Sequence, residues 1–459
     1  MSPPATSSQA AAPLPAWALW VRPLPAILVC IGLVASPALL SIGTGMLPAL
    51  FLLQRFWTPA RRQRLGIPPG QQRSLRISVL GVLLLFLLEL GSGLVAIDTG
   101  KWLSEVRLAL PLLLVPPLFW HGCPWGGTEL RRIFGTLVLA VIVVGGYSLL
   151  HYALHYAAIN DLVARSKELP IVKFGSNLQT LQEPYISHIY FSLLNAVAVF
   201  AALALAATAS QRWRWLWGGL ALVLLAYLHV FTGRTGLLAF YAGAALLLVR
   251  WLLVTRGRLK ILAGLVAGGG LLLALAWYTV PSFQQRVHLA EEDWRVYNNW
   301  HDVSGYSLAR RLVAYQMAWR LTLDHPVTGV GFSNTEAAME AAWQLQPRRR
   351  VRATMWLHDP HNQYLEWLLG GGFLFGGLAI AGFLYPLVQS LRHKWWLALV
   401  LGSVLFTGMF FETLLERHVG VSFYTLLWLL VLSLPAERPF GSAGTAHATV
   451  EPENDAPAH

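Results

Sequence analysis

Residues 357 to 377 read LHDPHNQYLEWLLGGGFLFGG and join an ionisable segment to an apolar one. His358, Asp359 and His361 come directly before a run that is apolar enough to enter a lipid bilayer. Ionisable side chains at a membrane segment cost free energy, so those that occur there typically serve a function. This stretch therefore predicts a membrane helix that begins at a chemically active end.

The rest of the chain has the composition of an integral membrane protein. Its 459 residues are 56% hydrophobic and only 12% charged, whereas soluble domains carry roughly a quarter charged residues. Apolar runs of about 20 residues, the length that crosses a bilayer, recur along almost the whole sequence. We therefore expect an all-α polytopic membrane protein of about 12 transmembrane helices, centred near residues 28, 47, 86, 111, 143, 197, 222, 244, 269, 375, 403 and 426.

Basic residues gather in alternate short loops and predict the orientation of the chain. Lysine and arginine concentrate in the cytoplasmic loops of membrane proteins, and long loops are exempt from this rule. With both termini inside, the cytoplasmic loops contain Arg55, Arg61, Arg62, Arg64, Arg73, Arg76, Arg131, Arg132, Arg212, Arg214, Arg250, Arg256, Arg258, Lys260, Arg392 and Lys394. The opposite short loops contain only Lys101, Arg165, Lys167, Lys173, Arg234 and Arg417. The long segment 281–360 then faces outward.

The sequence divides into five parts. Residues 1–13 and 436–459 are rich in Ala, Pro, Ser and Glu, and they are too poor in apolar residues to pack, so we expect disordered tails. Transmembrane helices one to nine occupy 14–280, a loop domain occupies 281–360, and helices ten to twelve occupy 361–435.

The loop domain has a helical pattern of its own. Ser307 is suited to be the N-cap of a helix whose apolar residues recur at helical spacing between Leu308 and Leu321, and Pro326 ends that helix. A second, short helix is expected from about Thr335 to Gln344.

Asp359 precedes Pro360, and this pair predicts how the tenth membrane helix begins. A residue before proline favours the extended backbone of an N-cap, and proline is favoured at the first helical position. His361 and Asn362 would then lie in the first turn, where the helix dipole disfavours a charged imidazole. We therefore interpret His361 as a neutral proton acceptor. The alternative is an interfacial histidine that hydrogen-bonds to a neighbouring loop.

Three arginines are candidate ligands for an anion. Arg234 stands between glycines that would let a diphosphate approach the backbone and the planar guanidinium. The alternative for Arg234 is a side chain that snorkels to water. Arg310 and Arg311 fall in the first turn of the loop-domain helix, where cations are unfavourable. An external anion would offset that cost, and so would a salt bridge to the acidic residues 291–293.

Motifs that bind a metal ion are absent from the sequence. The outward segments contain no D-x-D pair, and the chain contains no HExxH and no P-loop. The charge of a phosphate would then be met by arginine alone, with no metal and no other cofactor. Arginines and a histidine on one face of a membrane predict a phosphorylated substrate carried on a lipid, not a nucleic acid.

Three segments, in this order, resemble the O-antigen ligase and polymerase superfamily of bacterial envelope proteins. They are TGRTGLL at 232–238, the block from Arg311 through Tyr315 to DHPVTGVG at 324–331, and HNQYLEWLLGGG from His361. The large loop before the tenth helix extends the likeness over nearly the whole chain. The resemblance implies a GT-C-like fold with one large helical periplasmic loop.

The resemblance also implies a glycosyltransferase that uses a lipid-linked donor and no metal ion. It would take a finished polysaccharide, the O-antigen, from undecaprenyl diphosphate and join it to a sugar hydroxyl of lipid A-core. The reaction would occur among membrane lipids at the periplasmic face of the inner membrane of a Gram-negative bacterium. A single displacement would invert the anomeric centre.

Carried over by position, the resemblance assigns catalytic roles to three residues. Arg234 and Arg311 would bind the diphosphate, and His361 would activate the acceptor hydroxyl or steer the leaving group. Further contacts to the diphosphate or the glycan are expected from Arg310, His358, Asp359, Asn362, Tyr364 and Glu366. His358, Asp359 and Glu366 are also rival candidates for the base.

One departure from the family pattern concerns the glycines after this block. The family often has glycines three apart, whereas here Gly372 is followed by Phe375 and then Gly376. We expect these glycines to pack membrane helices closely together, in the manner of small-x-x-x-small motifs.

Three other functions fit parts of the pattern. An O-antigen polymerase shares the donor chemistry but extends a second lipid-linked chain, and a protein O-oligosaccharyltransferase often has an additional extracytoplasmic portion. A transporter of polyprenyl-linked sugars would also need arginines, but it predicts ionisable groups throughout the depth of the bilayer. The large loop directly before the His-Asn helix favours the ligase.

Overall fold

The computed structural model describes most of the chain, and its regular structure is helical. The described residues are 21–57, 67–155, 187–231, 233–255, 281–299, 302–303, 306–345 and 358–435, with isolated positions between 260 and 278. Within these ranges there is no β-strand. The predicted tails at 1–13 and 436–459 lie outside the described residues, and so does most of the predicted ninth span around residue 269.

The apolar runs in the described ranges form helices. They are α2 (Leu24–Ala35), α3 (Pro37–Trp57), α4 (Pro69–Gly91), α5 (Thr99–Leu114), α6 (Gly127–Leu154), α8 (His188–Thr208), α9 (Gln211–Val230), α10 (Arg234–Val254), α15 (Gln363–Arg392), α16 (Trp396–Phe411) and α17 (His418–Leu432). Each predicted span centre other than the ninth falls inside one of them. Among the described helices, α4, α5, α6, α8, α9, α10 and α15 are long and apolar enough to cross a membrane. This is a membrane protein, and the total of 12 spans stays a prediction.

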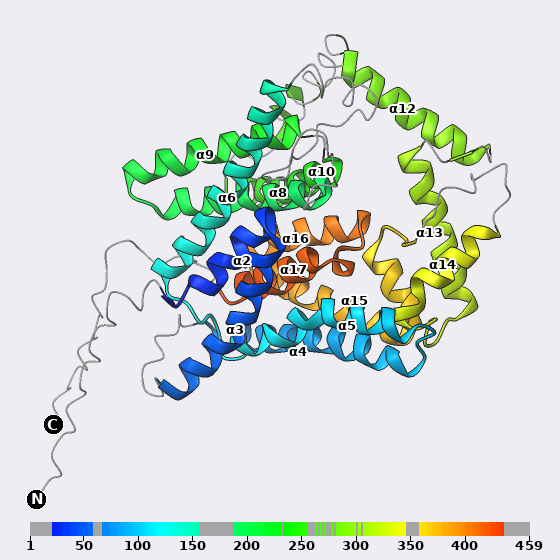
Figure 1. Ribbon diagram of the computed structural model, residues 1–459. Helices are drawn as coiled ribbons and strands as arrows, with labels where there is room; N and C mark the ends of the chain where they lie inside the picture. The colour runs from blue at the N-terminus through cyan, green and yellow to red at the C-terminus, as the bar shows by residue number, and fades with distance from the viewer. Residues whose placement is uncertain are drawn as a thin grey trace, which may run out of the picture.

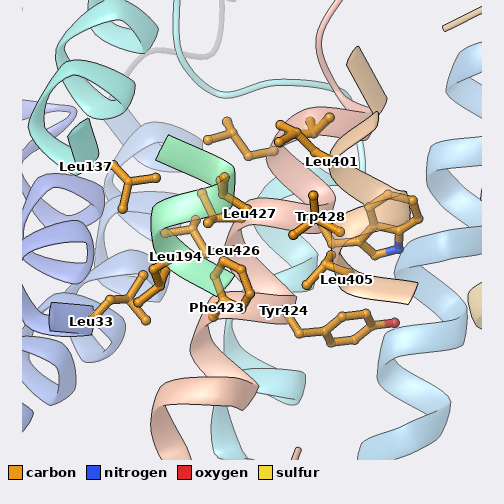
Figure 2. Packing of buried hydrophobic residues seen from close by; sticks show 14 of the residues in the cluster. Leu33, Leu137, Leu194, Leu401, Leu405, Phe423, Tyr424, Leu426, Leu427 and Trp428 are labelled. Carbon is orange, nitrogen blue, oxygen red and sulfur yellow. The ribbon is translucent and has the colours of Figure 1, made fainter. Parts of the chain in front are cut away.

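The centre of the bundle is α17. Residues 419–432 of this helix are all buried, and it lies against α2, α4, α5 and α16. Figure 2 shows Phe423, Leu427 and Trp428 of α17 among leucines from the surrounding helices, including Leu194 of α8 and Leu405 of α16. Because lipid tails are as apolar as leucine, close van der Waals contact holds such helices together more than escape from water does.

The segment predicted to face outward forms a small helical domain at one end of the bundle, on the right in Figure 1. It contains α12 (Pro281–Asn298), α13 (Ser307–Asp324), the 3-10 turn η3 (Phe332–Asn334) and α14 (Thr335–Gln344). The predicted bounds of α14 are confirmed. Side chains of α13 and α14 form a separate hydrophobic core that also receives Leu369 of α15. The domain therefore rests on that membrane helix.

The start of α13 is capped from another helix. The predicted N-cap, Ser307, is the first helical residue, and the residue before it, Tyr306, provides no side-chain cap. The carboxylate of Asp293 on α12 takes this role, because its Oδ2 accepts a hydrogen bond from Leu308 N at 3.0 Å. The prediction of Ser307 as N-cap is wrong, since a carboxylate distant in sequence satisfies the free N–H group.

α15 is broken at Gly372, where φ is 61° and ψ is −165°. A break removes helical partners from backbone N–H and C=O groups, and such groups must be paired again where water is scarce. Segment 326–331, which follows α13, provides the partners in both directions. The four bonds run from Val330 N to Leu369 O and Gly331 N to Gly370 O, both 2.9 Å, and from Phe373 N to Pro326 O at 2.8 Å and Leu374 N to Val327 O at 3.2 Å.

Glycine is required at this pairing because the backbones approach too closely for a side chain. A Cβ on Gly372 would lie 2.4 Å from the Val327 carbonyl, and one on Gly329 would lie 2.4 Å from the α15 backbone. A Cβ on Gly376 would lie 2.2 Å from Trp367 O of the same helix. The predicted packing of two membrane helices on Gly372 and Gly376 is therefore wrong. These glycines let α15 fold sharply on itself and on the loop domain.

We predict that Gly372→Ala lowers the free energy of unfolding by roughly 1–3 kcal/mol from backbone strain alone, with the steric clash adding to it. Gly377→Ala is the matched control, because a Cβ there meets nothing within 4 Å and alanine favours a helix interior. Thermal unfolding of both variants in detergent measures the difference. An unchanged midpoint for Gly372→Ala would show that the break does not need glycine.

Candidate functional site

α15 begins later than the sequence indicates. Its first residue is Gln363 and its N-cap is Asn362, whose side chain accepts hydrogen bonds from two backbone N–H groups of the first turn at 3.0 and 3.1 Å. The prediction of Asp359 as N-cap with Pro360 as first helical residue is wrong. The reason is that His361 has a φ of 49°, a left-handed conformation that cannot belong to a right-handed helix.

Asp359 holds His361 in this turn. Asp359 Oδ1 accepts a hydrogen bond from His361 N at 2.7 Å and lies 3.1 Å from Nδ1 of the imidazole. A carboxylate beside Nδ1 favours a proton on that nitrogen and leaves Nε2 as the ring acceptor. His361 directly precedes the N-cap instead of lying in the first turn, and the expectation that its imidazole is neutral stays a prediction. Its role as a base stays a prediction.

Glu412 is a further member of the site, and none of the three motif segments contains it. It directly follows α16, and its side chain lies between Arg311 and His361. Glu412 Oε2 is 3.6 Å from Arg311 Nη2, and Glu412 Oε1 is 3.7 Å from His361 Nδ1. An acidic residue directly after an apolar helix, in FETLLER at 411–417, is the signal that could have found it.

Tyr315 anchors α13 to the end of α16. Its hydroxyl donates to Phe410 O at 3.0 Å and lies 3.4 Å from His361 O. Arg311 precedes Tyr315 by one helical turn and so shares its face of α13. This anchor therefore brings Arg311 to Glu412, and its contact with His361 O joins the second motif segment to the third.

Three buried polar atoms around Glu412 have no hydrogen-bond partner among the described residues. Two of them lie within ion-pair distance of a charged group. The three atoms are Arg310 Nε, His361 Nδ1 and Glu412 Oε2. Burial lowers the pKa of Arg310 and the Arg311 charge lowers it further, while Asp359 and Glu412 act in the opposite direction. Because buried polar atoms are normally paired, this group has the character of a site for a polar or anionic ligand.

Arg234 begins α10 at the same end of the bundle. Gly236 of α10 packs on Ser192 of α8, and Gly408 of α16 packs on the adjacent Leu193. The start of α10 and the end of α16 are therefore level with the same turn of α8. This arrangement places Arg234 and the residues that follow α16 at one end of the molecule.

The side chain of Arg234 is exposed and interacts with α12. Burial raises the pKa of Asp293, while the N–H of Leu308 and the Arg234 guanidinium lower it. Because Asp293 caps α13, Arg234 lies near the helix start that carries Arg310. Arg234 therefore lies on the side of the site formed by α12, whereas Arg311 contacts Glu412 at the end of α16.

His358 belongs to a different cluster. Its Nδ1 lies 3.1 Å from Glu336 Oε1 of α14, and Lys101 at the start of α5 pairs with the other oxygen of that carboxylate. The cluster ties α5, α14 and the segment before His361 together, and a substrate contact for His358 stays a prediction. In the described part of the chain, no three His, Cys, Asp or Glu side chains are grouped as metal ligands.

Tyr364 and Glu366 connect the first turn of α15 to its neighbours. The Tyr364 hydroxyl donates to Phe406 O of α16 at 3.1 Å, and the carboxyl group of the buried Glu366 lies near Thr335 and Glu416. Two neighbouring carboxyl groups repel each other when both are charged, which favours a proton on one of them. Desolvation of its carboxyl group and the nearby Glu366 charge accordingly raise the pKa of Glu416 well above its usual value. Substrate contacts for Tyr364 and Glu366 stay predictions.

Comparisons with known proteins bear directly on this site. Residues 191–381 match the sequence profile of the O-antigen ligase family. The matched range runs from α8 into α15 and contains Arg234, Arg310, Arg311 and His361, while Glu412 lies beyond it. A search of curated proteins finds no match.

We predict that the protein loses stability as the pH rises above about 5, because the raised pKa of Glu416 beside Glu366 favours its protonated form in the folded state. A carboxyl whose pKa is raised by folding binds its proton more tightly in the folded state. Stability therefore falls from the unfolded pKa, near 4.5, up to the raised folded pKa. Glu416→Gln keeps a hydrogen-bond donor and should flatten this dependence in thermal unfolding. Glu340→Gln on α14 should keep the wild-type slope, and an equal slope in Glu416→Gln would contradict the prediction.

Proposed function

Because residues 191–381 match the sequence profile of the O-antigen ligase family, we propose that this protein transfers a finished polysaccharide from undecaprenyl diphosphate to a sugar hydroxyl of lipid A-core. The observation that carries the proposal is the meeting of Arg311, Glu412 and His361 at contacts of 3.6 and 3.7 Å. Unpaired polar atoms lie at the same point. Such a group can hold a diphosphate and an acceptor hydroxyl next to each other.

The arginines would stabilise the donor's leaving group. As the bond between the anomeric carbon and the diphosphate breaks, negative charge grows on the diphosphate. Fixed guanidinium groups stabilise that charge most where water is scarce. Arginine suits this task because its planar fork binds phosphate oxygens in pairs. Arg311 and Arg310 would bind the diphosphate directly, and Arg234 would bind it from the side of α12.

His361 would activate the acceptor. Asp359 Oδ1 lies 3.1 Å from Nδ1 of the imidazole and favours a proton on that nitrogen, which leaves Nε2 to take the proton of the attacking sugar hydroxyl. The hydroxyl oxygen forms the new bond to the anomeric carbon. The old carbon–oxygen bond breaks, and its electron pair stays on the diphosphate. Attack from the side opposite the leaving group inverts the anomeric centre.

We infer that this chemistry takes place at the periplasmic face of the inner membrane of a Gram-negative bacterium. The arrangement of basic residues in the short loops supports this orientation, since it predicts an outward position for the end at which α10 begins and α16 ends. A lipid-linked donor and a lipid-anchored acceptor would both reach that level from within the membrane.

The first test is transfer by the purified protein from a lipid-linked polysaccharide to a core acceptor. His361→Ala should lower the rate by about two to four powers of ten, the usual contribution of a general base. His288→Ala, which changes an exposed histidine of α12, should keep the wild-type rate. A chelator should leave the wild type active, because arginines supply the positive charge. A chelator-sensitive wild type or an active His361→Ala would contradict this mechanism.

A second test separates the ligase from the polymerase. In a strain that lacks this gene but makes O-antigen, lipopolysaccharide should lose all attached chains, while long lipid-linked polymer accumulates. The reason is that a ligase acts after the polymer is complete. Lipopolysaccharide that carries a single repeat unit would instead indicate a polymerase.

A further inference from the structure

The carboxylate of Glu412 is shared between the two groups to which the proposed function gives catalytic roles. We propose that Glu412 is a positioning residue that the donor displaces: its diphosphate takes Glu412's place on Arg311, and the freed carboxylate then supports His361. This inference rests on the proposed function and deepens it. It assigns to Glu412 the coupling between donor binding and activation of the acceptor.

The contacts of Glu412 are close enough to orient it and loose enough to be exchanged. Its two oxygens lie 3.6 Å from Arg311 and 3.7 Å from His361, and Oε2 makes no hydrogen bond within the described ranges. Its side chain is only 12% exposed, so water screens these charges incompletely. The Glu412 carboxylate thus lies between the Arg311 guanidinium and the His361 imidazole, and either contact can be exchanged.

The backbone around Glu412 is fixed independently of its side chain. The hydroxyl of Tyr190 on α8 donates to Leu414 O at 3.1 Å. The N–H of Leu415 donates to the side chain of Gln363, at the start of α15, at 2.8 Å. The loop therefore keeps its place when the carboxylate turns, and a change confined to the carboxylate leaves these bonds intact.

A diphosphate should bind the Arg311 guanidinium more strongly than the Glu412 carboxylate does. It carries more negative charge than one carboxylate, and its oxygens can form paired, charge-assisted hydrogen bonds with the guanidinium. Once displaced, Glu412 has His361 Nδ1 as its neighbouring partner. Two carboxylates, those of Glu412 and Asp359, would then face the imidazole and stabilise the positive charge that it gains with the acceptor's proton. The base would be strongest only when the donor is bound.

The test compares Glu412→Gln with the wild type in two measurements. The first is binding of geranylgeranyl diphosphate, a short polyprenyl diphosphate, in detergent. Binding should become roughly two- to fivefold tighter, because the ligand no longer competes with an ion pair of this kind. The second is turnover in the transfer assay, which should fall roughly 10- to 100-fold, as is typical when a partner that orients a functional histidine is removed.

Two further variants separate this role from a structural one. Glu412→Asp retains the charge and should recover part of the turnover, and Glu340→Gln on α14 should match the wild type in both measurements. A merely structural role predicts weaker diphosphate binding together with slower turnover, and that result would overturn the inference. Unchanged binding or unchanged turnover in Glu412→Gln would also overturn it. Failure of the wild type to bind the diphosphate or to transfer glycan would instead refute the proposed function itself.

Discussion

The break in α15 at Gly372 is the constraint on which the rest of the structure depends. Backbone groups released by a break must find partners where water is scarce, and segment 326–331 supplies them through four reciprocal hydrogen bonds. The loop domain is thereby joined to a membrane helix by backbone pairing, and not only by side-chain contacts. Glycines at 329, 372 and 376 are needed because the backbones meet at distances that exclude a Cβ.

This pairing fixes where the charged groups meet. It holds α13 beside α15, and Tyr315 then seats α13 on the end of α16, so that Arg311 comes to lie next to Glu412 and His361. Hydrogen bonds of Tyr190, Tyr315 and Gln363 fix the segments that carry these side chains. That explains how Arg310 Nε, His361 Nδ1 and Glu412 Oε2 can stay without hydrogen bonds inside the described protein. A site built in this way is organised before a ligand arrives, which favours catalysis through fixed charges.

Local sequence patterns predicted the helices well and their ends poorly. The described apolar runs became helices where expected, and the predicted bounds of α14 are those observed. Two N-caps were wrong, since Asp293 caps α13 from another helix and Asn362 replaces Asp359 at α15. The same limit hid Glu412, because its importance arises from neighbours that are distant in the chain.

The sequence by itself determined that this is a helical membrane protein with a histidine and arginines near the ends of its helices, because hydrophobicity and charge act residue by residue. Only the tertiary structure decided that Arg311, His361 and Glu412 meet, that His358 pairs with Glu336 instead, and that Arg234 lies near Asp293 of α12. The physical reason is that contact among ionisable groups depends on how helices are packed and where one of them breaks. Hydrogen bonds between distant segments set both, and no local pattern contains them.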